Sequence, residues 1–184
     1  MLFFNQKAKH SLRQQLAQFF DTPGVYFVYA NTSEQSSATY QQYVSQFVKN
    51  NLMRDIGLIS SDDSAIIPYL TVKANLLING HNVPLELVPS FLNHDTVYLE
   101  QLAEHLTPRQ SLDIQFFRSI LAGKRYIFMD DGLSALDPVE VRNFLVDAIQ
   151  ALKATESTLI VLTTDHSLLE SNPETAFETA PKLI

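Results

Sequence analysis

The sequence predicts an α/β fold: a parallel sheet with a helical region inserted into the middle third of the chain. Four runs of strand length are rich in β-branched and aromatic residues, which is typical of buried strands. They are residues 24–30, 56–59, 124–129 and 158–163. Segments with helical spacing separate these runs, and strands that alternate with helices favour a parallel sheet.

Helical periodicity accounts for most of the chain between these strands. Residues 7–20 and 40–47 both place apolar side chains at helical spacing. The polar stretch between the first strand and the second of these helices, residues 31–37, is expected to be a loop. An amphipathic helix is expected over residues 138–152, with Pro138 in its first turn.

The middle third, residues 70–121, is predicted to be mostly helical and broken at Pro84 and Pro89. We expect it to form a helical subdomain inserted into an α/β core. A chain of 184 residues can bury one sizeable core and is short for two. The sequence therefore predicts a single domain over residues 1–184.

Composition excludes several classes of function. The formal net charge is −7, which argues against nucleic-acid binding, because such proteins concentrate Lys and Arg. The chain has no cysteine, which excludes disulfides, zinc thiolate sites and thiol catalysis. Its apolar runs are of strand length, so we expect no direct membrane insertion. The first residues do not resemble a secretory signal. A cytoplasmic protein that reaches a membrane only through a partner is the expectation.

Four segments of the chain carry a resemblance to a known family. Residues 126–138, YIFMDDGLSALDP, are similar to the stretch of ABC ATPases that ends Asp-Glu-Pro-Thr-Ser-Ala-Leu-Asp-Pro. Upstream, residues 106–121 stand where that family has LSGGQ and a helix, and Gln110 precedes Asp130 by the family's 20 residues. Residues 67–77, IPYLTVKANLL, resemble the LTVxENL segment. Downstream, TLIVLTTD resembles the strand that ends Thr-His-Asp.

The resemblance implies a P-loop NTPase-like (ABC ATPase) core, but the phosphate-binding loop is altered. In the family this loop reads GxxxxGKS or GKT; its glycines let backbone amides wrap the phosphates, and its Lys reaches them. Here Ala30 and Gln35 replace the glycines, Ser36 replaces the Lys, and only Ser37 matches. Glu34 adds a negative charge where phosphates would lie. A polar connection between strand and helix is the simpler interpretation.

The signature motif is also changed. LSGGQ becomes LTPRQ, in which Thr107 and Gln110 are tolerable. Pro108 lacks an amide hydrogen and Arg109 is bulky. Arg109 could reach a partner's phosphate as a charged substitute. The alternative is a simple helix start, with Thr107 as the cap and Pro108 at the first helical position.

Two further nucleotide contacts of the family are replaced. The Q-loop glutamine falls at Ser61 or Asp62, and the switch histidine aligns with Thr164. Asp62 and Asp63 could bind a cation, although a solvated acidic turn is the simpler interpretation. His166 lies two residues beyond the switch position, and we expect a surface or helix-cap histidine there. No histidine spacing predicts a metal site.

The Walker B segment is better preserved. Asp130 matches the magnesium-ordering Asp, and Asp131 replaces the catalytic Glu with a side chain one methylene shorter. A shorter base is misplaced relative to the attacking water. The other interpretation is an acidic pair that ends a buried strand.

The D-loop is intact, and in the family it lies at the dimer interface. It comprises Ser134, Ala135, Leu136 and Asp137. Its retention predicts that dimer-type packing persists, with an ABC ATPase-type subunit as a homo- or heterodimeric partner.

The losses fall on the residues that ATP needs, while the strands and the D-loop remain. The sequence therefore predicts a non-hydrolysing ABC ATPase-like subunit that acts by protein–protein interaction, with an active ATPase, a membrane permease or both. No cofactor is expected. ATP and Mg²⁺ would be ligands only if the altered site still binds them. Two alternatives stay open: a soluble adaptor on this scaffold, and an unusual ATPase that uses Asp130, Asp131 and Arg109.

Overall fold

The computed structural model describes residues 2–61, 65–80, 88–93 and 95–183. Its centre is a five-stranded parallel sheet in the order β2-β3-β4-β1-β5. The strands are β1 (Gly24–Tyr29), β2 (Ile56–Ile59), β3 (Tyr126–Met129), β4 (Thr158–Thr163) and β5 (Ala176–Phe177). The predicted α/β class is confirmed, and the four predicted strands lie where the sequence indicates.

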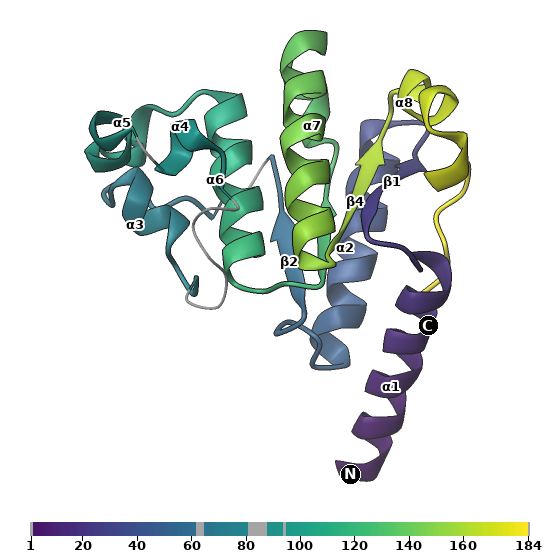
Figure 1. The fold of residues 1–184 in the computed structure, drawn as a ribbon. Helices are drawn as coiled ribbons and strands as arrows, with labels where there is room; N and C mark the ends of the chain where they lie inside the picture. The colour runs from purple at the N-terminus through teal and green to yellow at the C-terminus, as the bar shows by residue number, and fades with distance from the viewer. Residues whose placement is uncertain (1, 62–64, 81–87, 94, 184) are drawn as a thin grey trace.

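The helices complete the chain order shown in Figure 1. The α-helices are α1 (Leu2–Phe19), α2 (Ser33–Lys49), α3 (Val72–Leu76), α4 (Ser90–Asn93), α5 (Thr96–Glu100), α6 (Pro108–Leu121), α7 (Pro138–Thr155) and α8 (His166–Ser171). The short 3₁₀ turns are η2 (Ala103–His105), η3 (Gly132–Ala135) and η4 (Pro173–Thr175). Within the described residues, no helix is both long and apolar enough to cross a membrane.

Helices cover both faces of the sheet. On β1, Tyr26 and Val28 point toward α1 and α2, while Val25 and Phe27 point toward α6 and α7. Side chains alternate between faces along a strand, so burial of both faces requires consecutive apolar residues. This explains why the strands appear in the sequence as continuous apolar runs. In Figure 1, α7 crosses in front of the sheet and α1 extends away below it.

The middle third lies to one side of the sheet, where α3, α4, α5 and α6 gather (Figure 1). Apart from α6, its α-helices are only four or five residues long. A small core of Val72, Leu99 and Ile114 joins them, and an antiparallel bridge pairs Thr71 with Leu102. Pro84 lies outside the described residues, whereas Pro89 directly precedes α4, as a helix breaker does.

The predicted loop over residues 31–37 is wrong. Helix α2 begins at Ser33, because Thr32 caps it: the Thr32 hydroxyl accepts the backbone amide of Gln35. No glycine interrupts residues 30–37, and Glu34 in the first turn suits the positive end of the helix dipole. Local capping therefore starts the helix earlier than the polar composition suggested.

Candidate functional site

The candidate site lies along one edge of the sheet, where three parallel strands end. Ala30 follows β1, Asp130 and Asp131 follow β3, and Thr164 follows β4. Carboxyl ends of parallel strands meet at the same edge, which is where ligands bind in open α/β sheets. The fold thus brings together the positions that the resemblance predicts to be the phosphate loop, Walker B and the switch.

Between β1 and α2 the connection is only Ala30, Asn31 and Thr32. The amide of Ala30 donates to the carbonyl of Thr163 at 2.9 Å, which continues the sheet pairing. The side-chain oxygen of Gln35 accepts from the amide of Asn31 at 2.9 Å and from its side chain at 3.2 Å. These bonds fold the connection back onto the helix.

The remaining phosphate-loop positions, Gln35, Ser36 and Ser37, lie inside the first two turns of α2. Ser36 is buried, and its hydroxyl has no hydrogen-bond partner among the described residues. Glu34 is exposed at the helix start, where hydrogen bonds from its own backbone amide and from the Thr32 hydroxyl lower its pKa. A carboxylate of this chain thus accepts from donors at this end of the helix.

Asp130 is buried and is held by the segment that follows β2. One of its carboxylate oxygens accepts the Ser60 hydroxyl at 2.8 Å and the Ser61 amide at 2.8 Å. The Ser61 hydroxyl donates to the same oxygen at 3.2 Å. The Walker B position and the Q-loop position are therefore adjacent, and they contact each other directly.

Asp131 is held by the switch position. The Thr164 hydroxyl donates to one oxygen of its carboxylate at 2.7 Å, and the Thr164 amide approaches the other at 3.3 Å. On the other side, the Ser134 hydroxyl donates to the Asp131 backbone carbonyl at 2.6 Å. The two residues that the sequence resemblance predicts at the catalytic Glu and switch His positions thus pair with one another.

Arg109, at the altered signature motif, points into the protein. Its Nε lies 2.9 and 3.0 Å from the two carboxylate oxygens of Asp113, one turn along α6. Its two terminal nitrogens reach α7, at the Glu140 carbonyl (2.6 Å) and the Asp147 carboxylate (3.3 Å). Its guanidinium also lies 5.5 Å from the ring centroid of Phe144. Arg109 therefore links α6 to α7.

Asp113 is the buried centre of this network. Its side chain is 3% exposed and that of Arg109 is 13% exposed. Burial raises the pKa of Asp113 to about 6, although the hydrogen bond and charge of Arg109 oppose the change. The nearby carboxylates of Asp147 and Glu140 raise it further. Removal of Arg109 would leave this carboxyl group without its principal ionic partner.

The signature segment starts α6 with a capping box. The Thr107 hydroxyl accepts the Gln110 amide at 3.2 Å, and the Gln110 side chain accepts the Thr107 amide at 2.9 Å. Pro108 is in the first turn, as the sequence predicts. Thr107 and Gln110 are thus committed to the helix end.

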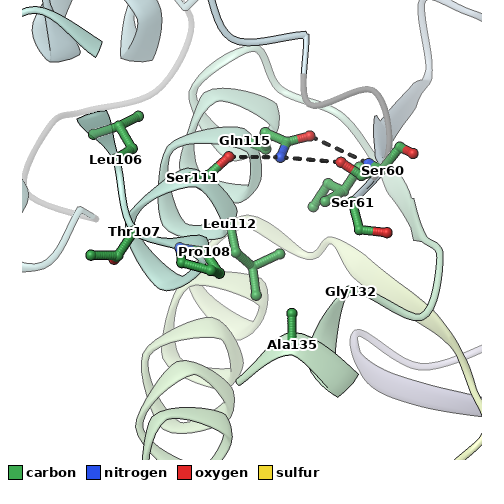
Figure 2. A pocket seen from close by; sticks show the side chains of 11 residues that line it. Ser60, Ser61, Leu106, Thr107, Pro108, Ser111, Leu112, Gln115, Gly132 and Ala135 are labelled. Atoms are coloured by element: carbon green, nitrogen blue, oxygen red, sulfur yellow. Dashed lines mark hydrogen bonds between the residues drawn. The ribbon is translucent and has the colours of Figure 1, made fainter. Parts of the chain in front are cut away.

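A cavity of about 270 Å³ lies between the start of α6 and the end of β2. Figure 2 shows Gln115 between Ser111 and Ser60, with Gly132 and Ala135 on the far side of the opening. The Gln115 side chain accepts the Ser60 amide at 3.3 Å and donates to the Ser111 hydroxyl at 3.4 Å. Every lining residue that the structure describes is uncharged. The cavity offers hydroxyl and amide groups but no cation.

The D-loop is at the surface beside this cavity. Ser134, Ala135 and Asp137 are exposed, and Leu136 is half-buried. The Asp137 carboxylate accepts the amides of Val139 and Glu140, at 2.8 and 2.9 Å, and so caps α7. Three of the four predicted interface residues are therefore accessible.

His166 lies at the start of α8, where its ring contacts two glutamates and a tyrosine. One ring nitrogen lies 3.2 Å from Glu170 and the other 3.5 Å from Glu178, and the ring packs edge-on against Tyr29. No group of three or more His, Asp or Glu side chains in the described part of the chain could hold a metal ion. Asp62 and Asp63 lie outside the described residues.

The site also contains residues that sequence reasoning missed. Ser60, rather than Ser61 alone, holds Asp130, and Gln115 reaches the same segment from α6. The spacing of Arg109 and Asp113, four residues apart on a helix, was an available signal for the ion pair. No local signal indicated that α7 completes it.

The fold is similar to that of a protein of known structure. No family model and no curated protein matches the sequence. A solved structure of CbiO1 from Clostridium perfringens, described as part of the ABC transporter complex CbiONQ, superposes with a TM-score of 0.60 at 14% identity. The match covers 78% of this chain and 68% of that one. The chain therefore has a fold similar to that of an ABC ATPase.

Proposed function

We propose that this protein is a non-hydrolysing ABC ATPase-like subunit that works through protein–protein contacts in an ABC transporter complex. The similar structure, CbiO1, belongs to such a complex. The single observation that carries the proposal is the start of α2. There, a capped helix and a carboxylate occupy the positions at which the ABC ATPase family binds phosphate.

The start of α2 does not fit a nucleoside triphosphate. A phosphate site at a helix N-terminus uses backbone amides that point at the ligand, together with the helix dipole. Here the Gln35 amide donates to Thr32, Glu34 brings a negative charge, and Ser36, at the lysine position, is buried. Phosphate would meet a carboxylate instead of an ammonium group.

The acidic residues offer no better place for Mg²⁺. Asp130 accepts hydrogen bonds from Ser60 and Ser61, and Asp131 accepts from Thr164. A metal ion would have to displace these donors, each a charge-assisted hydrogen bond of about 1.5–3 kcal/mol. The acidic residues at the end of β3 thus give little support for ATP with Mg²⁺ as a ligand.

Two surfaces support a role in assembly. The exposed D-loop residues Ser134 and Ala135 stand where the family forms dimers. Tyr69, Val97 and Leu102, which are 77, 82 and 48% exposed, lie in and beside the 67–77 segment. In the family, that region receives a permease. Of these three residues, Leu102 lies next to the segment, because its backbone pairs with Thr71; contiguous exposed apolar side chains are typical of protein contacts.

Nucleotide binding is the first test. The purified chain would be titrated with a fluorescent ATP analogue, with and without Mg²⁺, beside an intact ABC ATPase as the positive control. We expect no binding up to millimolar nucleotide. Micromolar binding by this chain would overturn the proposal.

Assembly is the second test. The tagged chain would be purified from solubilised membranes, in parallel with a Tyr69→Glu, Leu102→Glu variant and a Val48→Glu control. Val48 is 59% exposed on α2. We expect an ABC permease or an intact ABC ATPase to co-purify with the wild type and the control, and to be depleted with the double variant.

The two alternative functions make different predictions. An adaptor that has left transport would co-purify with a soluble partner and no membrane component. An unusual ATPase would show Mg²⁺-dependent turnover that Asp131→Ala abolishes. The inward direction of Arg109 disfavours that ATPase, because its charge is engaged by Asp113 and Asp147.

A further inference from the structure

A small pocket lies at the edge of the sheet opposite the candidate site. Asp55 and Arg125 directly precede β2 and β3, and the amides of Arg125 and Tyr126 donate to the Asp55 carbonyl at 3.1 and 3.3 Å. Because β2 and β3 are parallel, their amino ends meet at this edge. Helix α1 contributes Arg13 and its neighbours to the lining of the pocket, which has a volume of about 220 Å³.

Part of the pocket wall is apolar. Leu16 of α1, Leu52 of the turn before β2, and Ile56 of β2 all line the pocket and are buried. Ala17 also lines it and contributes only a methyl group. A ligand with an apolar body would therefore lose water-exposed apolar surface on entering this pocket, which is favourable.

Two exposed arginines and one aspartate are the charged residues of the lining. The Nε of Arg13 donates to a carboxylate oxygen of Asp55 at 3.0 Å, and a terminal nitrogen of Arg13 contacts the same oxygen. Within the described residues Arg125 forms no ion pair. Its guanidinium lies 5.7 Å from the ring centroid of Tyr126, a contact that orients it. Because Asp55 is already paired with Arg13, Arg125 leaves the lining with a net positive charge.

Hydrogen bonds hold the turn before β2 in place. The Nζ of Lys124 donates to the carbonyls of Met53 and Arg54, at 3.0 Å each. The amide of Asp55 donates to the carbonyl of Leu52 at 2.8 Å. Two residues of the lining, Leu52 and Asp55, thus belong to a turn that is fixed before any ligand arrives. Fixed walls lower the entropy that binding costs.

We propose that this pocket binds a small monocarboxylate with an apolar body, such as an aromatic or branched aliphatic acid. The carboxylate pairs with the guanidinium of Arg125, whose fork of donors matches the two carboxylate oxygens. The apolar body lies against Leu16, Leu52 and Ile56. The volume limits the size of the ligand, since drug-sized ligands occupy about 300 Å³ or more. The inference stands apart from the loss of ATP binding, which concerns the opposite edge of the sheet.

Benzoate is the probe for this pocket, and two matched compounds separate the contributions to binding. Benzamide has the same shape without the charge, and inorganic phosphate has charge without an apolar body. Titrations of the isotope-labelled protein, followed by NMR, should give a benzoate Kd of about 1 mM, which is normal for so small a ligand. The amide signals of Leu52 and Tyr126 should shift, and those of Asp131 and Thr164 should not. Benzamide and phosphate should each bind at least about tenfold more weakly.

Three variants test the residues of the pocket, and circular dichroism would verify that each folds. Arg125→Gln should weaken benzoate binding about tenfold, whereas Arg142→Gln, at an exposed arginine outside the pocket, should leave it unchanged. Ala17→Leu should fill the pocket and abolish binding. Asp55→Asn frees Arg13 and should tighten binding a few-fold, a gain that misfolding cannot produce.

Several results would overturn the proposal. One is a failure of benzoate to shift any pocket signal at up to about 20 mM, well above the expected Kd. Another is binding of benzamide or phosphate as tight as that of benzoate, because the pocket would then not recognise charge and apolar body together. The third is benzoate binding that Arg125→Gln and Ala17→Leu both leave unchanged, because the ligand would then lie elsewhere.

Discussion

The hydroxyl of Thr164 donates to the carboxylate of Asp131 at 2.7 Å, across the gap between the ends of β4 and β3. The sequence resemblance predicts that these residues stand at the positions of the switch histidine and the catalytic glutamate of ABC ATPases. The Thr164 side chain and amide thus both bind the carboxylate of Asp131.

Restoring this pair alone should not restore an enzyme. A variant with Asp131→Glu and Thr164→His carries the family's residues at both positions, but α2 still presents Glu34 and a capped helix start. We expect phosphate release from ATP to stay at background in a coupled assay. Mg²⁺-dependent turnover would mean that the start of α2 binds phosphate after all.

Arg109→Ala should destabilise the fold. It leaves the carboxyl group of Asp113, 3% exposed, without its ionic partner, and breaking such a buried pair costs about 3–5 kcal/mol. Urea unfolding followed by circular dichroism would measure the loss. Arg54→Ala, at an exposed position, is the control and should change stability by less than about 0.5 kcal/mol.

Asp113 should make stability depend on pH. Its pKa is about 6 in the folded protein, against an ordinary value of 3.8, so the folded state holds the proton more tightly between these values. The stability that this group contributes is therefore full below about pH 4 and is lost as the pH rises through 6. A pKa difference of about 2 corresponds to at most about 3 kcal/mol.

The matched comparison is Asp113→Asn, which lacks this titration. The free energy of unfolding of the wild type minus that of the variant should fall between pH 4 and pH 7. All other carboxylates are common to both proteins and cancel. A difference that is flat with pH would contradict the assignment to Asp113.

Gly57 should tolerate no side chain. A Cβ at this position in β2 would lie 2.8 Å from both Cβ and Oγ of Ser119 on α6. Gly57→Ala should therefore cost about 1–3 kcal/mol through overpacking. Ser119→Gly removes both clashing atoms, so the two changes together should be more stable than their separate effects sum to, in a double-mutant cycle of thermal unfolding. Strict additivity would mean that β2 and α6 do not meet here.

The strands were predictable because their burial on both faces produces a local pattern in the sequence. Residues of β1 and β4 face a helix layer on each side, so their apolar runs are unbroken. The two-residue strand β5 has no such pattern: Ala176 and Phe177 are defined by pairing with β1, which only the folded chain supplies. Helix α8, six residues long, was missed for the same reason, since periodicity needs a longer window.

The candidate site was predictable in position but not in detail. The sequence predicted that Asp130 and Asp131 follow one buried strand and that Thr164 follows another, and the parallel sheet brings these strand ends to one edge. The sequence did not indicate which side chains would donate hydrogen bonds to these carboxylates, because Ser60 and Asp130 are 70 residues apart. The direction of Arg109 depends likewise on Asp147 and on the packing of α6 against α7.

The placement of β1 has a consequence for the newly made chain. This strand leaves the ribosome early, but both of its neighbours, β4 and β5, come from the last part of the sequence. Until Thr158–Thr163 and Ala176–Phe177 have been synthesised, the backbone of β1 has no strand to pair with. Such distant pairing slows folding and exposes intermediates to aggregation. We expect truncated chains that end before Thr158 to be held by chaperones.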